Sequence, residues 1–132
     1  MKKLLTYTLP RKFKDINIPI NIQSCYLRDY AQKKDLIYVL PQTEVIKKDC
    51  YFILNSLISN NSHMNNLICM TSIFMLPYSN MIYLKKLLDQ DKSQKLEWHF
   101  PFESIVCSSK GVIKILEESK NMDYSKKLVS YL

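Results

Sequence analysis

Polar side chains that could bind or transform a small ligand follow each of four apolar segments of the chain. They are Arg11 after the first segment, Glu44 after the second, Ser72, Tyr78 and Ser79 after the third, and His99 and Glu103 at the fourth. A guanidinium can hold a phosphate, and carboxylates can accept hydrogen bonds from hydroxyls. An imidazole beside a carboxylate can transfer protons near neutral pH. His99, Glu103 and Glu44 are therefore the candidates for catalytic residues.

The four apolar segments are predicted to be β-strands, because they are short, rich in β-prone residues and bounded by turn residues. They span residues 4–9, 36–40, 67–71 and 96–100. Between them, apolar residues recur at helical spacing. Helices are predicted to begin near Pro19, Asp49, Ser79 and either Ser108 or Ser109, with the serines and Asp49 as caps. Residues 120–132 are expected to form a C-terminal helix or a docked tail.

Alternating strands and helices favour a parallel sheet, because parallel strands need crossover connections. We expect residues 1–132 to form a single three-layer α/β domain, with helices on both faces of a four-stranded, mainly parallel sheet in the order 2-1-3-4. Ligands of such sheets bind outside the carboxyl ends of the strands. Arg11, Glu44, His99 and Glu103 are therefore expected to converge there. The alternative is that they only cap helices and face solvent, so whether the protein is an enzyme stays open.

Composition excludes several function classes. The single glycine in 132 residues leaves no glycine-rich phosphate loop of the Rossmann or Walker kind. The four cysteines form no C-x-x-C pair, so no metal site is predicted, and no cofactor is indicated. The net charge of +7 favours anionic partners. However, only two arginines occur and the lysines form dispersed pairs, which is typical of a solvated face, so no specific nucleic-acid binding is expected.

The chain has no apolar run of the roughly 20 residues that a membrane span needs. Its first residues resemble the start of a signal peptide, but the apolar stretch ends at Thr6, which is too early. We therefore predict a cytoplasmic protein. Small parallel sheets with an apolar helix face often dimerise, so we also expect a homo-oligomer.

Residues along most of the chain resemble the sporadic carbohydrate cluster proteins, which are encoded within bacterial surface-polysaccharide loci. The matching residues are Arg11, Phe13, Pro19, Gln23, 27–30, Leu40, Pro41, Glu44, Tyr51, Leu54, Ser72, 74–77, His99, Phe100 and Glu103. The chain departs from the family in having Pro10 where the family usually has a serine before the arginine, and in lacking a clear basic residue at 80–83.

This resemblance implies a role in the biosynthesis of O-antigen, capsule or lipopolysaccharide. The polar residues after the strands and the positive net charge, taken with this pathway, predict an anionic sugar or sugar nucleotide as ligand at the carboxyl edge of the sheet. The ligand-binding residues are then expected to be Arg11, Gln23, Arg28, Glu44, Ser72, His99 and Glu103. An alternative is a non-catalytic partner of an enzyme of the glycan pathway.

The order of elements resembles, more distantly, the catalytic domain of serine recombinases. Those enzymes need a nucleophilic serine after the first strand and a cluster of arginines around the scissile phosphate. Here Pro10 occupies the first position, and Arg11 and Arg28 are the only arginines. The resemblance therefore implies a resolvase-like domain without strand-exchange chemistry.

Overall fold

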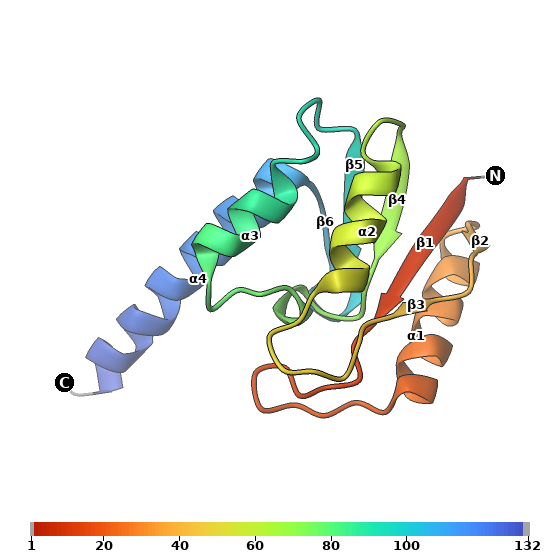
Figure 1. Ribbon diagram of the computed structural model, residues 1–132. Helices are drawn as coiled ribbons and strands as arrows, with labels where there is room; N and C mark the ends of the chain where they lie inside the picture. The colour runs from red at the N-terminus through yellow and green to blue at the C-terminus, as the bar shows by residue number, and fades with distance from the viewer. Residues whose placement is uncertain (1, 131–132) are drawn as a thin grey trace.

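The computed structural model describes the backbone of residues 2–130 and the side chains of residues 2–119. Its strands are β1 (Lys3–Thr8), β2 (Ile37–Tyr38), β3 (Gln42–Thr43), β4 (Asn66–Cys69), β5 (Leu96–Phe100) and β6 (Ile105–Ser108). Its helices are α1 (Ile20–Lys33), α2 (Phe52–Asn61), α3 (Met81–Leu88) and α4 (Ser109–Ser130), with short 3-10 turns η1 (Ile73–Met75) and η2 (Pro101–Glu103) (Figure 1).

The sheet is mixed and has the order β2-β1-β4-β5-β6, with β3 paired to the end of β1. All pairs are parallel except β5 with β6. The four expected strands are β1, β2, β4 and β5, and they lie in the expected order. The expected strand count was wrong, because the sheet has six strands.

The two additional strands were missed for different reasons. β3 has only two residues, both polar and exposed, so no apolar pattern marks it. β6 follows β5 through η2 and Ser104, whose φ of 56° places it in the left-handed region. This turn reverses the chain without the glycine or asparagine that usually signals such a turn.

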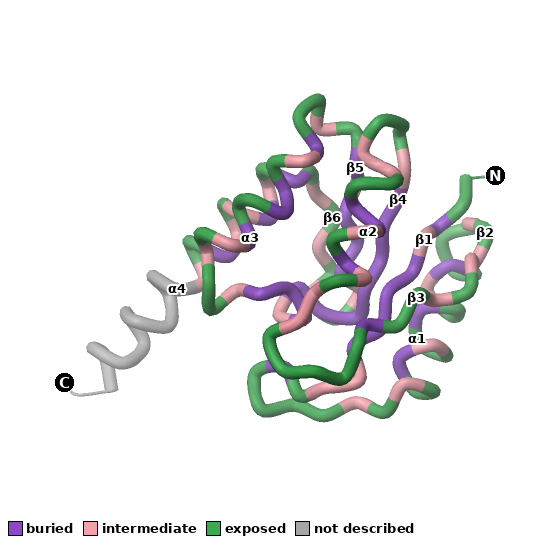
Figure 2. The backbone as a smooth tube through the Cα atoms, in the orientation of Figure 1, coloured by how far each residue is buried: buried purple, intermediate pink, exposed green. Residues whose placement is uncertain are grey.

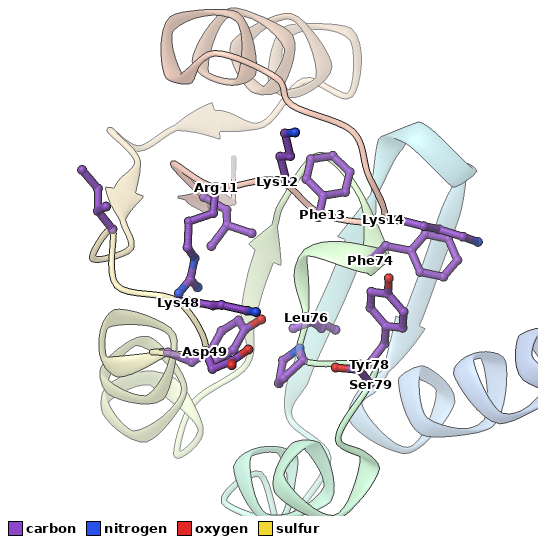
Figure 3. A pocket seen from close by; sticks show the side chains of 14 residues that line it. Arg11, Lys12, Phe13, Lys14, Lys48, Asp49, Phe74, Leu76, Tyr78 and Ser79 are labelled. Atoms are coloured by element: carbon purple, nitrogen blue, oxygen red, sulfur yellow. The ribbon is translucent and has the colours of Figure 1, made fainter.

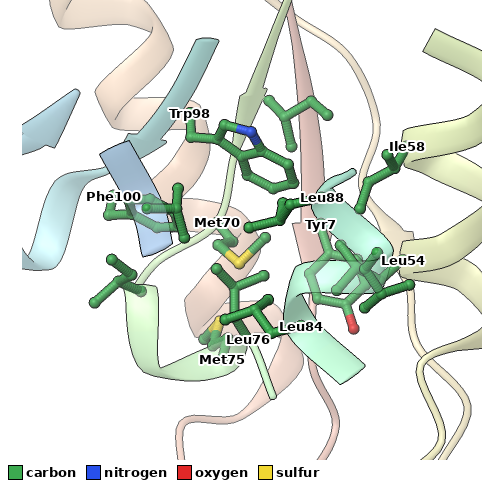
Figure 4. Packing of buried hydrophobic residues seen from close by; sticks show 14 of the residues in the cluster. Tyr7, Leu54, Ile58, Met70, Met75, Leu76, Leu84, Leu88, Trp98 and Phe100 are labelled. Carbon is green, nitrogen blue, oxygen red and sulfur yellow. The ribbon is translucent and has the colours of Figure 1, made fainter. Parts of the chain in front are cut away.

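Helices cover both faces of the sheet and make a three-layer domain (Figures 1 and 2). On one face α1 contributes Leu27 and Ala31 to a small buried cluster with Leu4, Leu67 and Cys69. On the other face α2, α3 and α4 cover a larger cluster that includes Tyr7, Met70, Trp98, Phe100 and Leu88 (Figure 4). Among the described residues, no helix is long and apolar enough to span a membrane.

Alternation along β5 decides which side chains face which layer. Trp98 and Phe100 enter the large cluster, with their rings stacked at 6.2 Å between centroids. His99 lies between them in sequence and therefore faces α1, where it meets Tyr30. The alternation of side chains along β5 thus places His99 on the face opposite α2, α3 and α4.

Two helix caps differ from the expectation. The N-cap of α2 is Tyr51 rather than Asp49, whose φ of 60° turns the chain before the helix begins. The N-cap of α3 is Asn80 rather than Ser79, and its side-chain oxygen accepts a hydrogen bond from the backbone N–H of Tyr83 at 3.2 Å. Helix α4 begins at Ser109, one of the two expected serines. The expected docking of residues 120–132 concerns side chains that lie outside the described residues.

A buried carboxylate joins α3, β5 and α4. Asp91 is fully buried and accepts hydrogen bonds from the backbone N–H groups of Lys95 (2.8 Å) and Leu96 (3.2 Å). It also accepts one from the Ser109 hydroxyl at 2.7 Å, and Ser109 in turn accepts one from the indole N–H of Trp98 at 2.9 Å. The start of α4 is thereby fixed to the start of β5.

Replacing Asp91 with alanine should destabilise the fold strongly, because three donors, two of them buried, would lose their acceptor. We expect a loss of ~3 kcal/mol in the free energy of unfolding, measured by chemical denaturation. Asp89→Ala is the matched control, because Asp89 is exposed on the same turn, and it should change stability by less than ~0.5 kcal/mol. Equal effects of the two substitutions would contradict this account of Asp91.

Candidate anion-binding site

A hollow of about 370 Å³ lies at the carboxyl ends of β1 and β4. The chain leaves β1 toward α1 on one face of the sheet and leaves β4 toward α3 on the other, so this is the point where the strand order reverses. Ligands of open α/β sheets bind at such points. Three segments line the hollow: residues 9–14 after β1, residues 46–51 before α2, and residues 74–79 around the end of η1.

Cationic side chains form one wall. Arg11 and Lys48 come from facing loops and lie on the same side of the hollow (Figure 3). Arg11 donates hydrogen bonds to the backbone carbonyls of Lys47 and, at 2.9 Å, Cys50. Its guanidinium also lies over the ring of Tyr51, 4.9 Å from the centroid. Arg11 thus fastens the loop after β1 to the loop before α2 and keeps its charge at the wall.

Aromatic side chains form the opposite wall. The rings of Phe74 and Tyr78 meet edge to face, with centroids 5.2 Å apart (Figure 3). The ammonium of Lys14 lies over Phe74, 3.9 Å from the ring centroid. Burial, followed by the nearby Asp15 carboxylate, raises the pKa of Tyr78, so its hydroxyl stays protonated at neutral pH.

Glu44 is buried and serves the fold. Its carboxylate accepts hydrogen bonds from the Tyr7 hydroxyl and from the backbone N–H groups of Val45, Ile53 and Leu54, all at 2.9 to 3.0 Å. These four donors occupy the roughly four lone-pair sites that a carboxylate has. The negative charge at the first turn of α2 also suits the helix dipole. Burial and, secondarily, Glu44 raise the pKa of Tyr7, which therefore remains a donor.

Glu103 and Ser72 join the two 3-10 turns. The Glu103 carboxylate accepts hydrogen bonds from the Ser72 hydroxyl at 2.7 Å and from the backbone N–H of Ile73 at 2.8 Å. The Ser72 hydroxyl also accepts one from the backbone N–H of Phe74 at 3.2 Å. This pair therefore caps η1 from η2 and sets the position of Phe74.

Gln23 and Arg28 both belong to α1, but they lie in different surroundings. Gln23 is buried and holds the segment after β1: its amide oxygen accepts from the N–H of Leu9 at 3.0 Å, and its amide nitrogen donates to the carbonyls of Leu9 and Ile18 at 2.8 Å. Arg28 is exposed, and one of its terminal nitrogens lies 3.9 Å from the sulfur of Cys25. Neither residue lines the hollow.

His99 belongs to a separate hydrogen-bonded chain on the α1 face. Its Nδ1 lies 2.6 Å from the Tyr30 hydroxyl oxygen, and its Nε2 lies 2.9 Å from Oε1 of Glu97. Burial lowers the pKa of His99, and the neighbouring Glu97 only partly offsets this effect. The chain Tyr30–His99–Glu97 links α1 to β5.

The structure brings together only part of the predicted set. Of the predicted ligand-binding residues, Arg11 lines the hollow. Within the described part of the chain, no hydrogen bond or ion pair joins any two of Arg11, Glu44, His99 and Glu103. Each carboxylate instead satisfies nearby backbone N–H groups, which loops at a sheet edge leave unpaired. Among residues 2–119, no cluster of three or more His, Cys, Asp or Glu could hold a metal ion.

Sequence reasoning missed Lys48 and Phe74. Lys48 belongs to one of the dispersed lysine pairs, which are typical of a solvated face, although it stands between a predicted strand end and a predicted helix start, as ligand-binding loop residues do. Phe74 belongs to the apolar run 73–76, and nothing in that run distinguishes a ring at a pocket wall from a ring in the core.

No protein-family model and no curated protein matches the chain. Among the solved structures that match, one covers 96% of this chain and is itself covered to 99%. It is the N-terminal catalytic domain of TP901-1 integrase, with a TM-score of 0.63 and 15% sequence identity. The chain has a resolvase-like fold. At this identity the likeness concerns the fold alone, and it agrees with the distant architectural resemblance to recombinase catalytic domains.

Replacing Glu44 with alanine should unfold the resolvase-like domain more readily, because four donors would lose a buried acceptor. We expect a loss of ~3 kcal/mol or more in the free energy of unfolding, measured by denaturant titration. The control is Glu117→Ala, which removes an exposed ion pair with Lys85 and should cost less than ~1 kcal/mol. A Glu44→Ala protein as stable as the wild type would contradict a structural role for Glu44 and favour a role in ligand binding.

His99 should make stability depend on pH. Because burial holds its pKa below the ordinary 6.5, the unfolded chain takes up a proton first as the pH falls. Stability should therefore be constant above that value and decrease below it until the folded protein also binds the proton. His99→Gln should remove this decrease between about pH 7.5 and about pH 5.5, whereas His63→Gln, in an exposed loop, should retain it. Identical pH profiles for the wild type and His99→Gln would contradict the assignment.

Proposed function

We propose that this protein binds a phosphorylated carbohydrate, either a sugar phosphate or a nucleotide sugar, in the hollow at the carboxyl ends of β1 and β4. The observation that carries the proposal is the composition of the hollow: four cations, Arg11, Lys12, Lys14 and Lys48, line it with one carboxylate, Asp49. The pathway in this proposal, the making of bacterial surface carbohydrate, rests on the sequence resemblance to the sporadic carbohydrate cluster proteins alone, since no family model matches the chain.

The cationic wall has donors to offer an anion. Arg11 uses two of its five N–H donors on backbone carbonyls, which leaves three for a ligand. Within residues 2–119, no carboxylate forms an ion pair with Arg11, Lys12 or Lys48. A phosphate would therefore gain charge-assisted hydrogen bonds without first breaking an ion pair at these three residues.

The proposal concerns binding and assigns no reaction. The sequence candidates for acid and base chemistry were His99, Glu103 and Glu44, and none of them lines the hollow. Glu44 and Glu103 already accept hydrogen bonds from the backbone and from hydroxyls. A function through binding alone is thus better supported than catalysis by these three residues.

The fold likeness favours a second candidate, a resolvase-like domain that contacts nucleic acid without strand exchange. Its TM-score of 0.63 to a recombinase catalytic domain is the supporting observation. No serine occurs in residues 9–19, which connect β1 to α1, so the nucleophile that strand exchange requires after the first strand is missing. We therefore rank this candidate below carbohydrate phosphate binding.

A thermal-shift panel tests the main proposal. Glucose 1-phosphate and UDP-glucose should raise the melting temperature, because a ligand that binds only the folded state adds ~2.7 kcal/mol at a hundredfold excess over its Kd. Lys48→Gln should weaken this effect, whereas Lys92→Gln, an exposed lysine outside the hollow, should not. Stabilisation that is the same in both variants would reject the hollow as the site.

The same protein should bind duplex DNA only weakly. With a net charge of +7 and two arginines, we expect binding that is independent of sequence and disappears at ~0.15 M salt. Fluorescence anisotropy with two unrelated duplexes over a salt series measures this. Sub-micromolar, sequence-selective binding at that salt concentration would favour the second candidate instead.

A further inference from the structure

The two walls of the hollow differ in the chemistry they offer. Arg11 and Lys48 present positive charge on one side, with the Tyr51 ring against Arg11. Phe74 and Tyr78 present ring surfaces on the other side, with the Lys14 ammonium over Phe74 (Figure 3). A ligand that satisfies both walls carries phosphate at one end and a flat or apolar ring at the other. A free sugar phosphate has the first feature but not the second.

The side chains of the hollow offer sugar hydroxyls few hydrogen-bond acceptors, namely Asp49 and the hydroxyls of Tyr51, Tyr78 and Ser79. Its lining contains no Asn, Gln, Glu or His, and Asp49 is its single carboxylate. Burying hydroxyls without hydrogen-bond partners is unfavourable, whereas stacking a flat ring against an aromatic side chain is favourable. The lining therefore favours a nucleobase over a sugar ring at the aromatic wall.

Phe74 is held in place before any ligand arrives. Its backbone N–H donates to the Ser72 hydroxyl at 3.2 Å, and that hydroxyl donates to Glu103 at 2.7 Å. Its ring is half-buried and meets Tyr78 edge to face at an interplanar angle of 81°. The long side chain of Lys14 reaches over the ring, which shows that a cation has access to it. A base that stacks on this face of the ring takes the place of the Lys14 ammonium.

We propose that the hollow recognises the nucleoside diphosphate part of a nucleotide sugar, with the base against Phe74 and Tyr78 and the phosphates at Arg11 and Lys48. This inference rests on the proposed function and narrows its ligand class. It places the sugar toward solvent, because a hollow of about 370 Å³ is near the lower end of the ~300–1,000 Å³ typical of ligand pockets. The affinity of the protein then depends on the nucleotide and changes little with the sugar attached to it.

Isothermal titration calorimetry of the full chain tests the inference, with ADP, GDP, CDP, UDP, UDP-glucose, pyrophosphate and glucose 1-phosphate as probes. At least one nucleoside diphosphate should bind about tenfold or more tightly than pyrophosphate, because stacking one base on an aromatic side chain contributes on this order. If that diphosphate is UDP, UDP-glucose should bind as tightly as UDP.

Variants separate the two walls. Phe74→Leu should lower nucleotide affinity about tenfold to the level of pyrophosphate and leave pyrophosphate affinity unchanged. Lys48→Gln should weaken both probes. Phe102→Leu is the matched control, because Phe102 is exposed on η2 and lies outside the hollow. Tyr78→Leu serves as a second aromatic variant should Phe74→Leu fail to fold. The comparison of nucleotides with pyrophosphate uses the wild-type protein and therefore does not depend on any variant.

The outcomes test nucleotide recognition separately from the proposed binding of a phosphorylated carbohydrate. Pyrophosphate or glucose 1-phosphate binding as tightly as every nucleotide would overturn the inference and leave the proposed phosphate site standing. Nucleotide binding that Phe74→Leu and Tyr78→Leu do not change would also overturn it. Absence of binding by every phosphate compound would overturn both the inference and the proposed function.

Discussion

The carboxylate of Glu44 connects β1, the start of the loop that follows Glu44, and the start of α2. It accepts from Tyr7 in β1, from Val45 directly after itself, and from Ile53 and Leu54 at the start of α2. Because the charge is buried, the alternative to these four hydrogen bonds is an unpaired ion in the interior, which is strongly unfavourable. The loop of residues 45–51 must therefore arch over the carboxyl end of β1. Because Lys48 lies in this loop, its side chain reaches the hollow.

The other loops at this edge are held by the same device. Gln23 fixes the segment after β1 through Leu9 and Ile18, and Glu103 fixes η1 through Ser72 and Ile73. Each loop leaves the sheet with backbone groups that have no strand partner, and each receives a buried or half-buried polar side chain to satisfy them. The polar residues at this edge are therefore turned inward, toward the backbone groups of the loops.

This arrangement explains how far the sequence could predict the site. Strand ends located Arg11, Glu44 and Glu103 at the correct edge, because apolar runs mark parallel strands clearly. Strand ends do not tell whether a side chain points toward a ligand or toward the backbone beneath it. For His99 a signal did exist: Leu96, Trp98 and Phe100 are apolar at alternate positions, so His99 must face the opposite layer.

Some features of the fold could be predicted from the sequence and others could not. The order β2-β1-β4-β5 follows from apolar runs and crossover connections, and the structure agrees with it. β6 could not be predicted, because its reversal depends on Ser104 in a left-handed conformation that its residue type does not favour. Asp49 has a similar conformation, so a residue that would ordinarily cap a helix is used here to turn the chain instead.

Backbone conformation gives the hollow a further property. Of the six non-glycine residues with positive φ among those described, Lys14, Asp15 and Asp49 lie in the two loops that flank it. Lys14 and Asp15 form a two-residue turn closed by paired hydrogen bonds of 2.9 Å between Phe13 and Ile16. Such conformations cost of order 1 kcal/mol each and persist only where surrounding contacts impose them. Loops fixed at that cost have less entropy to lose when a ligand binds, so the strain and the inward-turned polar residues both favour a site that is formed in advance.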